Sequence, residues 1–142
     1  VFENYNYSVF HDNDPEVWNY KSKPTLVSKL LFHEYKFRDI DKENEIVLTI
    51  NGEVFRMKKA IISFGRKGYD CNTFSEFGGN NVSRRHFVII NMKDNVWLYD
   101  LDSTGVYVDG KRVSNKCFLL GLHTIKFGNY EIEINTDSTK LL

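Results

Sequence analysis

The chain has 142 residues, of which 42% are hydrophobic and 15% aromatic, so it is long and apolar enough to fold as one domain and is not a disordered segment. Lys and Arg together number 19, as do Asp and Glu, and this balance excludes a global field that draws the protein to nucleic acid or to an anionic membrane. No apolar run is long enough to span a bilayer.

The cysteines and histidines predict neither a metal site nor a cofactor site. Cys71 and Cys117 stand far apart and have no CxxC partner, and the four histidines at positions 11, 33, 86 and 123 are equally scattered. We therefore expect no metal and no cofactor. The simplest interpretation is an intracellular protein of a reducing compartment, the nucleus or the cytoplasm, although two cysteines can also form one bridge.

Residues 1–44 are predicted to be an N-terminal extension, irregular and partly helical. The stretch from Val1 to Asp14 is rich in Asn, Tyr and Asp and has no period, whereas Asp14-Pro15 and Pro24 are each suited to open a helix. Because the chain begins with Val1 and not with Met, we also expect it to be a fragment of a longer protein.

An apolar stripe follows Pro24. Its members stand four residues apart, as on one face of a helix, although a strand over 25–32 fits as well. They are Leu26, Val27, Leu30, Leu31 and Tyr35. The stripe either packs on the main domain or forms a contact surface for a partner or a neighbouring domain.

From residue 45 the sequence predicts short strands separated by tight turns. Asn51-Gly52 between two alternating runs indicates a hairpin, because both turn residues must accept a positive φ. Further hairpins are expected around 93–95, Asp109-Gly110 and Gly128-Asn129. The expected strands are 45–50, 53–58, 60–64, 87–91, 96–101, 106–108, 111–113, 123–127 and 130–134.

This succession of strands, with no helix between them, predicts an all-β fold. We expect a β-sandwich of two antiparallel-rich sheets over residues 45–134, followed by a C-terminal tail at 135–142. Binding on such a sandwich is expected at the loops of one end.

Two long loops interrupt the series of tight hairpins. One runs from Arg66 to Phe87 and contains Ser83-Arg84-Arg85-His86, and the other contains Asp102-Ser103-Thr104-Gly105. Together they supply guanidinium groups and hydroxyls. These are the groups that bind a phosphate dianion, since Arg offers a fixed fork of donors and Ser or Thr a short neutral donor.

Four motifs in this order resemble the forkhead-associated (FHA) domain, a β-sandwich family that recognises phosphothreonine in short peptides. They are Ile62-Ser-Phe-Gly-Arg66, Val82-Ser-Arg-Arg-His-Phe87, Leu98 to Gly110, and Leu120 to Gly128. The resemblance covers about Glu45 to Ile134. It implies a signalling module for phosphothreonine-dependent protein–protein interaction, and not an enzyme. The implied partner is a phosphothreonine-containing protein or peptide, with no nucleic acid and no membrane.

The resemblance also implies roles for particular residues. Arg66 and Ser83 would bind the phosphate oxygens, and Arg84 would add a contact at the rim of the pocket. The residues expected to support the pocket are Gly65, His86, Gly105 and, as a cap of the second loop, Asp100.

The chain departs from the family at Asp102–Gly105. The family usually has Ser/Thr-Asn-Gly, in which the Asn holds the peptide backbone. Here Thr104 takes the Asn place and Ser103 the preceding hydroxyl place. We therefore expect Ser103 and Thr104 to face the peptide, with the missing amide supplied by Asn80 or Asn81.

Two other functions remain open. The domain could be a phosphate-independent scaffold or dimerisation module that uses a lateral sheet face or the apolar stripe. Asp100-Leu-Asp102-Ser-Thr104 also resembles the DxDxT motif of haloacid-dehalogenase phosphatases. That chemistry needs Mg²⁺, a lysine, an acidic pair and a doubly wound α/β scaffold, whereas the residues after Thr104 are predicted to be strands.

Overall fold

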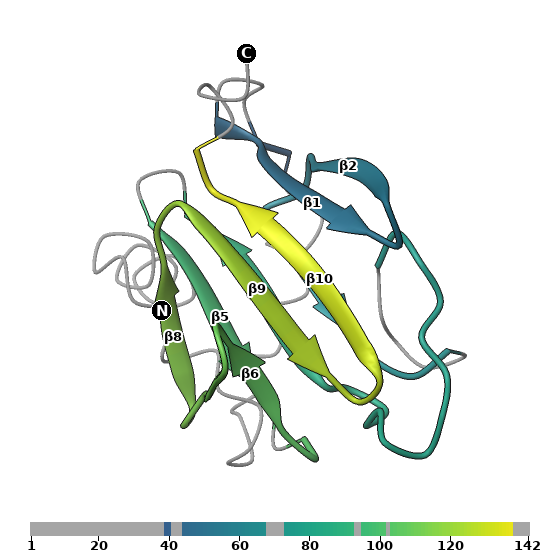
Figure 1. Ribbon diagram of the computed structural model, residues 1–142. Helices are drawn as coiled ribbons and strands as arrows, with labels where there is room; N and C mark the ends of the chain where they lie inside the picture. The colour runs from purple at the N-terminus through teal and green to yellow at the C-terminus, as the bar shows by residue number, and fades with distance from the viewer. Residues whose placement is uncertain (1–38, 41–43, 68–72, 93–94, 102, 138–142) are drawn as a thin grey trace, which may run out of the picture.

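The computed structural model describes residues 39–40, 44–67, 73–92, 95–101 and 103–137, and these form a sandwich of two sheets (Figure 1). Strand order is β2-β1-β10-β9-β6-β7 in the six-stranded sheet and β3-β4-β5-β8 in the four-stranded sheet. The strands are β1 Ile46–Ile50, β2 Glu53–Met57, β3 Ile61–Phe64, β4 Phe87–Asn91, β5 Val96–Asp100, β6 Val106–Val108, β7 Lys111–Arg112, β8 Lys116–Leu119, β9 Leu122–Phe127 and β10 Tyr130–Asn135.

The predicted all-β sandwich is confirmed. Every pair of these strands is antiparallel. The helices expected after Asp14 and Pro24, and the apolar stripe, lie outside the described residues. No helix in the described part of the chain is long and apolar enough to cross a membrane.

Tight turns set the register of the hairpins. Asn51 and Gly52 have φ of 52° and 81°, and Asp109 and Gly110 have φ of 52° and 83°. Positive φ at both central residues is the pattern of a type I′ turn, whose twist matches that of the flanking strands. These two predicted hairpins, β1–β2 and β6–β7, are therefore confirmed, as are the pairings β4–β5 and β9–β10.

One strand was not predicted. β8 pairs with β5 on one side only and is the edge of its sheet. Its sequence, Lys-Cys-Phe-Leu, is short and begins with a charge, so its alternation is weak. Beyond this, the observed strand ends differ from the predicted ones by about a residue, as expected of boundaries read from a sequence.

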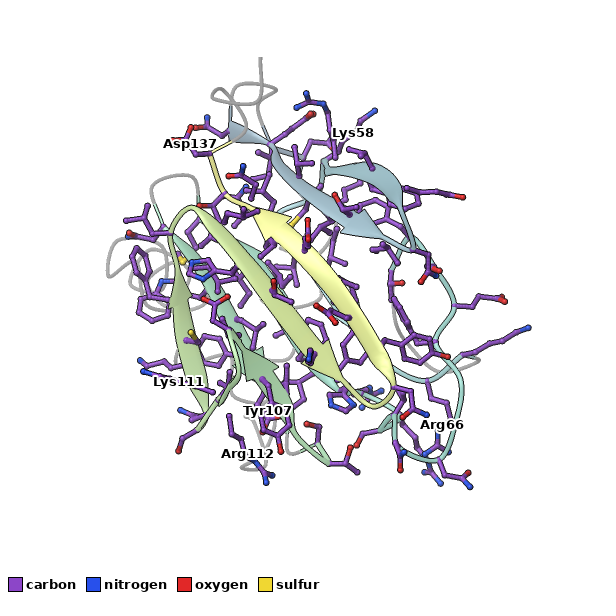
Figure 2. The ribbon with its side chains drawn as sticks, viewed as in Figure 1. Lys58, Arg66, Tyr107, Lys111, Arg112 and Asp137 are labelled. Carbon is purple, nitrogen blue, oxygen red and sulfur yellow. The ribbon has the colours of Figure 1, made fainter. Side chains whose placement is uncertain are left out.

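The sandwich has two opposite ends, at which the strands end and the loops begin. Arg66 and Arg112 lie at one end, together with the β9–β10 turn, and Lys58 and Asp137 lie at the other (Figure 2). The expected binding loops therefore share the Arg66 end, which we call the loop end.

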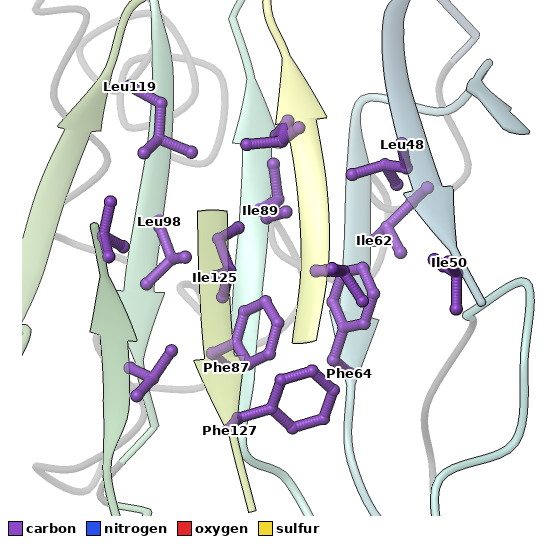
Figure 3. Packing of buried hydrophobic residues seen from close by; sticks show 14 of the residues in the cluster. Leu48, Ile50, Ile62, Phe64, Phe87, Ile89, Leu98, Leu119, Ile125 and Phe127 are labelled. Atoms are coloured by element: carbon purple, nitrogen blue, oxygen red, sulfur yellow. The ribbon is translucent and has the colours of Figure 1, made fainter. Parts of the chain in front are cut away.

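The core lies between the sheets and becomes aromatic toward the loop end (Figure 3). Phe64 stacks on Phe87 with ring centroids 4.4 Å apart, and Phe127 meets Phe87 edge-on at 4.9 Å. All three side chains are at most 1% exposed. Burying a side chain of this size stabilises the fold by about 1.5–3 kcal/mol, so these aromatic residues stabilise the part of the core that lies nearest the loops.

Candidate functional site

The two long loops are joined directly at the loop end. The Thr104 amide donates to the Ser83 hydroxyl at 3.1 Å, and the Thr104 hydroxyl donates to the Asn81 carbonyl at 2.8 Å. Thr104 and Asn81 are exposed, and Ser83 is half-buried. The structure thus brings together three of the residues that the sequence placed at a peptide-binding surface.

Arg66 is bonded to the same loop. Its backbone amide donates to the Ser83 carbonyl at 3.0 Å, and its side-chain Nε donates to the Val82 carbonyl at 2.9 Å. The side chain is half-exposed. Because Nε is held by the loop, the planar guanidinium has a defined orientation at the protein surface.

The Ser83 hydroxyl accepts a bond and has a proton to give. It accepts from the Thr104 amide, and no acceptor for its proton is present among the described residues. A hydroxyl carries one donor and two acceptor positions. Ser83 can therefore donate to an anion without giving up the bond that positions it.

His86 joins the two loops from beneath. Its side chain is fully buried, with Nδ1 accepting from the Ser83 amide at 3.1 Å and Nε2 lying 2.7 Å from the Gly105 carbonyl. Since Nδ1 accepts, Nε2 must carry the proton and donate to Gly105. Burial lowers the pKa of His86, and this outweighs the opposing effects of the Gly105 carbonyl and of Asp100. His86 is thus a neutral brace at pH 7 and not a cationic ligand.

Ser103 has bonding partners inside its own loop. Its hydroxyl donates to Oδ1 of Asp100 and accepts from the Gly105 amide at 3.0 Å, while its own amide donates to the same carboxylate oxygen at 3.2 Å. The only proton of the hydroxyl is therefore used inside the loop. Ser103 therefore shapes the loop and has one acceptor position, but no proton, to offer a peptide. Asp100 is buried and caps the loop.

A residue that sequence reasoning assigned no role supports the first loop. A Cβ added to Gly128 would lie 2.8 Å from Cγ2 of Val82 and 3.2 Å from the Asn81 carbonyl. Real Cβ atoms do not approach this closely, so only glycine lets the β9–β10 turn pack against the loop. The glycine did stand in a recognised motif, Leu120 to Gly128, but the contact spans distant parts of the sequence.

Tyr130 and Phe77 hold the other part of that loop. The Tyr130 hydroxyl accepts from the Gly78 amide at 2.8 Å and donates to the Gly78 carbonyl at 3.0 Å. Phe77 is 1% exposed and meets both Phe127 and Tyr130 edge-on at 4.9 Å. The loop is therefore anchored to the aromatic end of the core. Its sequence, polar and rich in glycine, gave no signal of this.

Basic side chains are concentrated in three described segments at the loop end. In the described segments 65–67, 80–86 and 103–105 every charged side chain is basic, namely Arg66, Lys67, Arg84 and Arg85. Lys67 pairs with Glu76 at 3.1 Å, and Arg84 and Arg85 are exposed. A chain of zero net charge thus concentrates positive charge where its phosphate-binding residues were expected.

The fold and the sequence of this region define a known family. The FHA-domain family model matches residues 62–128, which include both loops and the strands that bear them. The recognition from sequence motifs is confirmed over residues 62–128, which match the FHA-domain model. No curated protein matches the chain.

Solved FHA domains are similar to about two thirds of the chain. The FHA domain of the CT664 protein from Chlamydia trachomatis is 20% identical with a TM-score of 0.57, over 64% of this chain and 96% of that one. The FhaA FHA domain complexed with the intracellular domain of Rv3910 is 26% identical with a TM-score of 0.55, over 63% of this chain and 99% of that one. A domain studied for phosphothreonine-dependent FHA interactions is 25% identical with a TM-score of 0.56, over 64% of this chain and 95% of that one.

Proposed function

We propose that this FHA domain is a phosphothreonine-dependent interaction module that binds a short segment of a partner protein at the loop end. The observation that carries the proposal is the bonded set Arg66, Ser83 and Thr104, in which one guanidinium and one hydroxyl with a proton to donate are held on the same loop framework. Support comes from the similar FhaA domain, which is solved in complex with a protein domain, and from the similar domain studied for phosphothreonine-dependent interactions.

The mechanism is electrostatic and directional. A phosphothreonine carries a charge of about −1.5 to −2 at pH 7 and offers three strong acceptor oxygens. Arg66 and Ser83 donate to these oxygens, and Arg84 contributes positive charge at the rim. A hydrogen bond to a charged group contributes about 1.5–3 kcal/mol, so two such bonds make binding depend on the phosphate by about a hundredfold or more.

Thr104 and Asn81 hold the peptide backbone in this proposal. Both are exposed beside Ser83, and the Asn81 side-chain amide offers two donors and one acceptor. The Thr104 hydroxyl donates to Asn81, so toward a peptide it acts as an acceptor. Asn81 thereby supplies the amide that the family carries at the Thr104 position.

The phosphatase alternative does not fit this geometry. A DxDxT phosphatase uses its first aspartate as a nucleophile on a doubly wound parallel sheet. Here Asp100 is buried and bonded to Ser103, and the strand pairs are antiparallel. We therefore propose an interaction module that has no catalytic residues and that requires neither a cofactor nor a metal.

The proposal includes an intracellular, reducing location, because Cys71 and Cys117 provide no disulfide framework. Cys117 is a free thiol, partly buried. Thiol labelling after unfolding without reductant, read by mass spectrometry, should modify both cysteines. A bridge between them would contradict this part of the proposal.

An oriented peptide library with a central phosphothreonine tests the binding site. The wild-type domain should retain phosphothreonine peptides and release the same peptides after phosphatase treatment. Arg66→Ala should lose retention, whereas Arg56→Ala, which removes an exposed arginine of β2, should behave as wild type. Equal retention of phosphorylated and dephosphorylated peptides would favour the phosphate-independent scaffold instead.

A further inference from the structure

An exposed tyrosine and an arginine lie side by side at the loop end, outside the set of residues that the proposed phosphate site uses (Figure 2). Tyr107, in the middle of β6, stands directly opposite Arg112 of β7 in the antiparallel register. Residues that stand directly opposite each other put their side chains on the same face of a sheet. Tyr107 is 39% exposed, whereas its neighbours Val106 and Val108 are buried, so this is the outer face of the six-stranded sheet.

The two side chains meet over Gly105, which belongs to the second loop. A Cβ added to Gly105 would lie 3.4 Å from Cε1 and 3.6 Å from the hydroxyl oxygen of Tyr107, and 3.7 Å from Cζ of Arg112. The preceding residue, Thr104, donates its amide to the Ser83 hydroxyl at 3.1 Å. The Tyr107–Arg112 pair and the proposed phosphate site are therefore neighbours along one short piece of backbone.

The pair lies within reach of a peptide that is bound at Ser83. From the Ser83 hydroxyl, the path to the Arg112 guanidinium consists of the 3.1 Å bond to Thr104, one residue of backbone and the 3.7 Å contact at Gly105. Consecutive Cα atoms are about 3.8 Å apart, so the whole path is at most about 13 Å long. An extended chain rises by about 3.3 Å per residue, so this span corresponds to about four residues or fewer.

Arg112 and Tyr107 both have donors to give. Within the part of the chain that the structure describes, no hydrogen bond or ion pair engages the Arg112 guanidinium or the Tyr107 hydroxyl. A guanidinium offers five N–H donors in a planar fork, and a phenol offers one O–H. The fork matches two oxygens of a carboxylate or of a phosphate, so the pair has the chemistry of a site for an anion.

A lysine extends the pair on the same face. Lys126 of β9 stands opposite Tyr107 on the side away from Arg112, so Arg112, Tyr107 and Lys126 form one cross-strand row. Lys126 lies 3.9 Å from Glu131, and both side chains are more than half exposed. An ion pair of this kind is weak, so the row keeps a positive field.

The acidic residue that follows β6 is directed away from this row. Oδ1 of Asp109 accepts from the Thr124 amide at 2.9 Å, and Oδ2 lies 2.6 Å from Nδ1 of His123. The carboxylate is thus engaged by β9, and it does not neutralise Arg112.

We propose that Tyr107 and Arg112 form a second subsite, which binds an anionic side chain of the segment that carries the phosphothreonine, within about four residues of it. The anion is a carboxylate or a second phosphate, held by the guanidinium fork and the phenol hydroxyl. This inference rests on the proposed function, because the phosphothreonine is what places the segment beside Gly105. It narrows the partner to acidic or multiply phosphorylated segments.

A charge scan of phosphopeptides on the full chain tests the subsite. One glutamate is moved through the four positions on each side of the phosphothreonine, and an all-glutamine phosphopeptide is the reference. At the position that reaches the subsite, the wild type should bind the glutamate peptide about three- to tenfold more tightly than the reference. This ratio of two affinities cancels any general change in the affinity or stability of a variant.

Arg112→Gln should bring the ratio to about one, and Tyr107→Phe, which removes only the hydroxyl, should lower it. Lys111→Gln is the matched control: it makes the same charge change at the adjacent exposed residue of β7, whose side chain points to the other face, and should keep the ratio of the wild type.

Phosphoserine at the selected position distinguishes the two anions. A ratio above that of glutamate assigns the subsite to a second phosphate, and an equal or smaller ratio assigns it to a carboxylate. Ratios near one for both anions at every position, or a ratio that Arg112→Gln leaves unchanged, would overturn this inference. Equal binding of the all-glutamine peptide with and without its phosphate would instead contradict the proposed function.

Discussion

The core and the loop end of this domain are held together by different forces. The core consists of close-packed apolar side chains such as Leu48 and Ile134, which have no hydrogen-bonding groups to offer a ligand. The loop end consists of directed hydrogen bonds, such as those of Ser83 and His86, above an aromatic base. Stability and recognition therefore depend on separate residues, and substitutions should separate them.

The two regions meet at few points. Gly128 and Phe77 connect the loop to the end of the core by close packing, and His86 connects it by hydrogen bonds. Substitutions at these points should change both properties together. The following predictions are ordered by the size of the expected effect.

The largest effect is expected in the core. Leu48→Ala removes a fully buried side chain of β1 far from the loops and should destabilise the domain by about 2–5 kcal/mol, from lost burial and the cavity left behind. Chemical denaturation measures the loss. At temperatures at which the variant stays folded, its peptide affinity should match wild type. A reduced affinity of the folded variant would show that recognition depends on the core as a whole.

Arg66→Ala should show the opposite pattern. Phosphopeptide affinity should fall by about ten- to a hundredfold, since one charged donor to the phosphate, which contributes about 1.5–3 kcal/mol, is lost. The free energy of unfolding should change by less than about 1 kcal/mol, since the side chain is half-exposed. Calorimetric titration and denaturation, with Arg56→Ala as control, measure both. Strong destabilisation would make Arg66 a structural residue.

Gly128→Ala should affect both properties. The new methyl would meet Val82 at 2.8 Å, so the Asn81–Val82 loop must shift. We expect a loss of about 1–3 kcal/mol in stability, as for other overpacked sites, and weaker peptide binding because Asn81 moves. Gly110→Ala, at an open turn with nothing within 4 Å of the added Cβ, controls for the backbone conformation alone. Similar binding by both variants would contradict the coupling.

Acidification should loosen the loop end through His86. Its folded-state pKa lies below the ordinary value of 6.5, so the unfolded chain binds the proton more readily. Stability is thus complete above about pH 6.5 and falls as the pH drops below it, by at most about 1.4 kcal/mol per pH unit. Melting curves between pH 7.5 and 5 should show this slope for wild type and a smaller slope for His86→Asn. Equal slopes would show that His86 is not the group that titrates.

The smallest effect is expected at Thr104. Thr104→Asn keeps the backbone amide that bonds Ser83 and adds an amide side chain beside the peptide. Affinity for the selected phosphopeptide should stay nearly unchanged, because Asn81 already supplies that amide. A severalfold rise in titration would mean that Asn81 does not supply it, and a large loss would mean that the Thr104–Asn81 bond shapes the site.

The sequence predicted most strands and turns for a physical reason. Alternation along β10 and positive-φ pairs such as Asn51-Gly52 are local, and each can be recognised within a few residues. Edge strand β8 was missed because it lacks such a pattern. Arg66 and Ser83 were identified by motif order, and the structure joins their backbones.

Contacts across the loop end could not be predicted from the sequence in the same way. The bonds from Ser103 to Asp100 and from Tyr130 to Gly78 depend on the three-dimensional path of the loops. The internal bonds of Ser103 and the close contact of Gly128 were therefore not predicted.

The most direct test of the central claim is a ¹⁵N–¹H NMR titration of the wild-type domain with a library-selected phosphothreonine peptide. The account predicts that amide shifts concentrate at residues 65–67, 81–86 and 103–105 and vanish when the peptide is dephosphorylated. Shifts that concentrate on β8 or at the opposite end of the sandwich, or that persist without the phosphate, would contradict it.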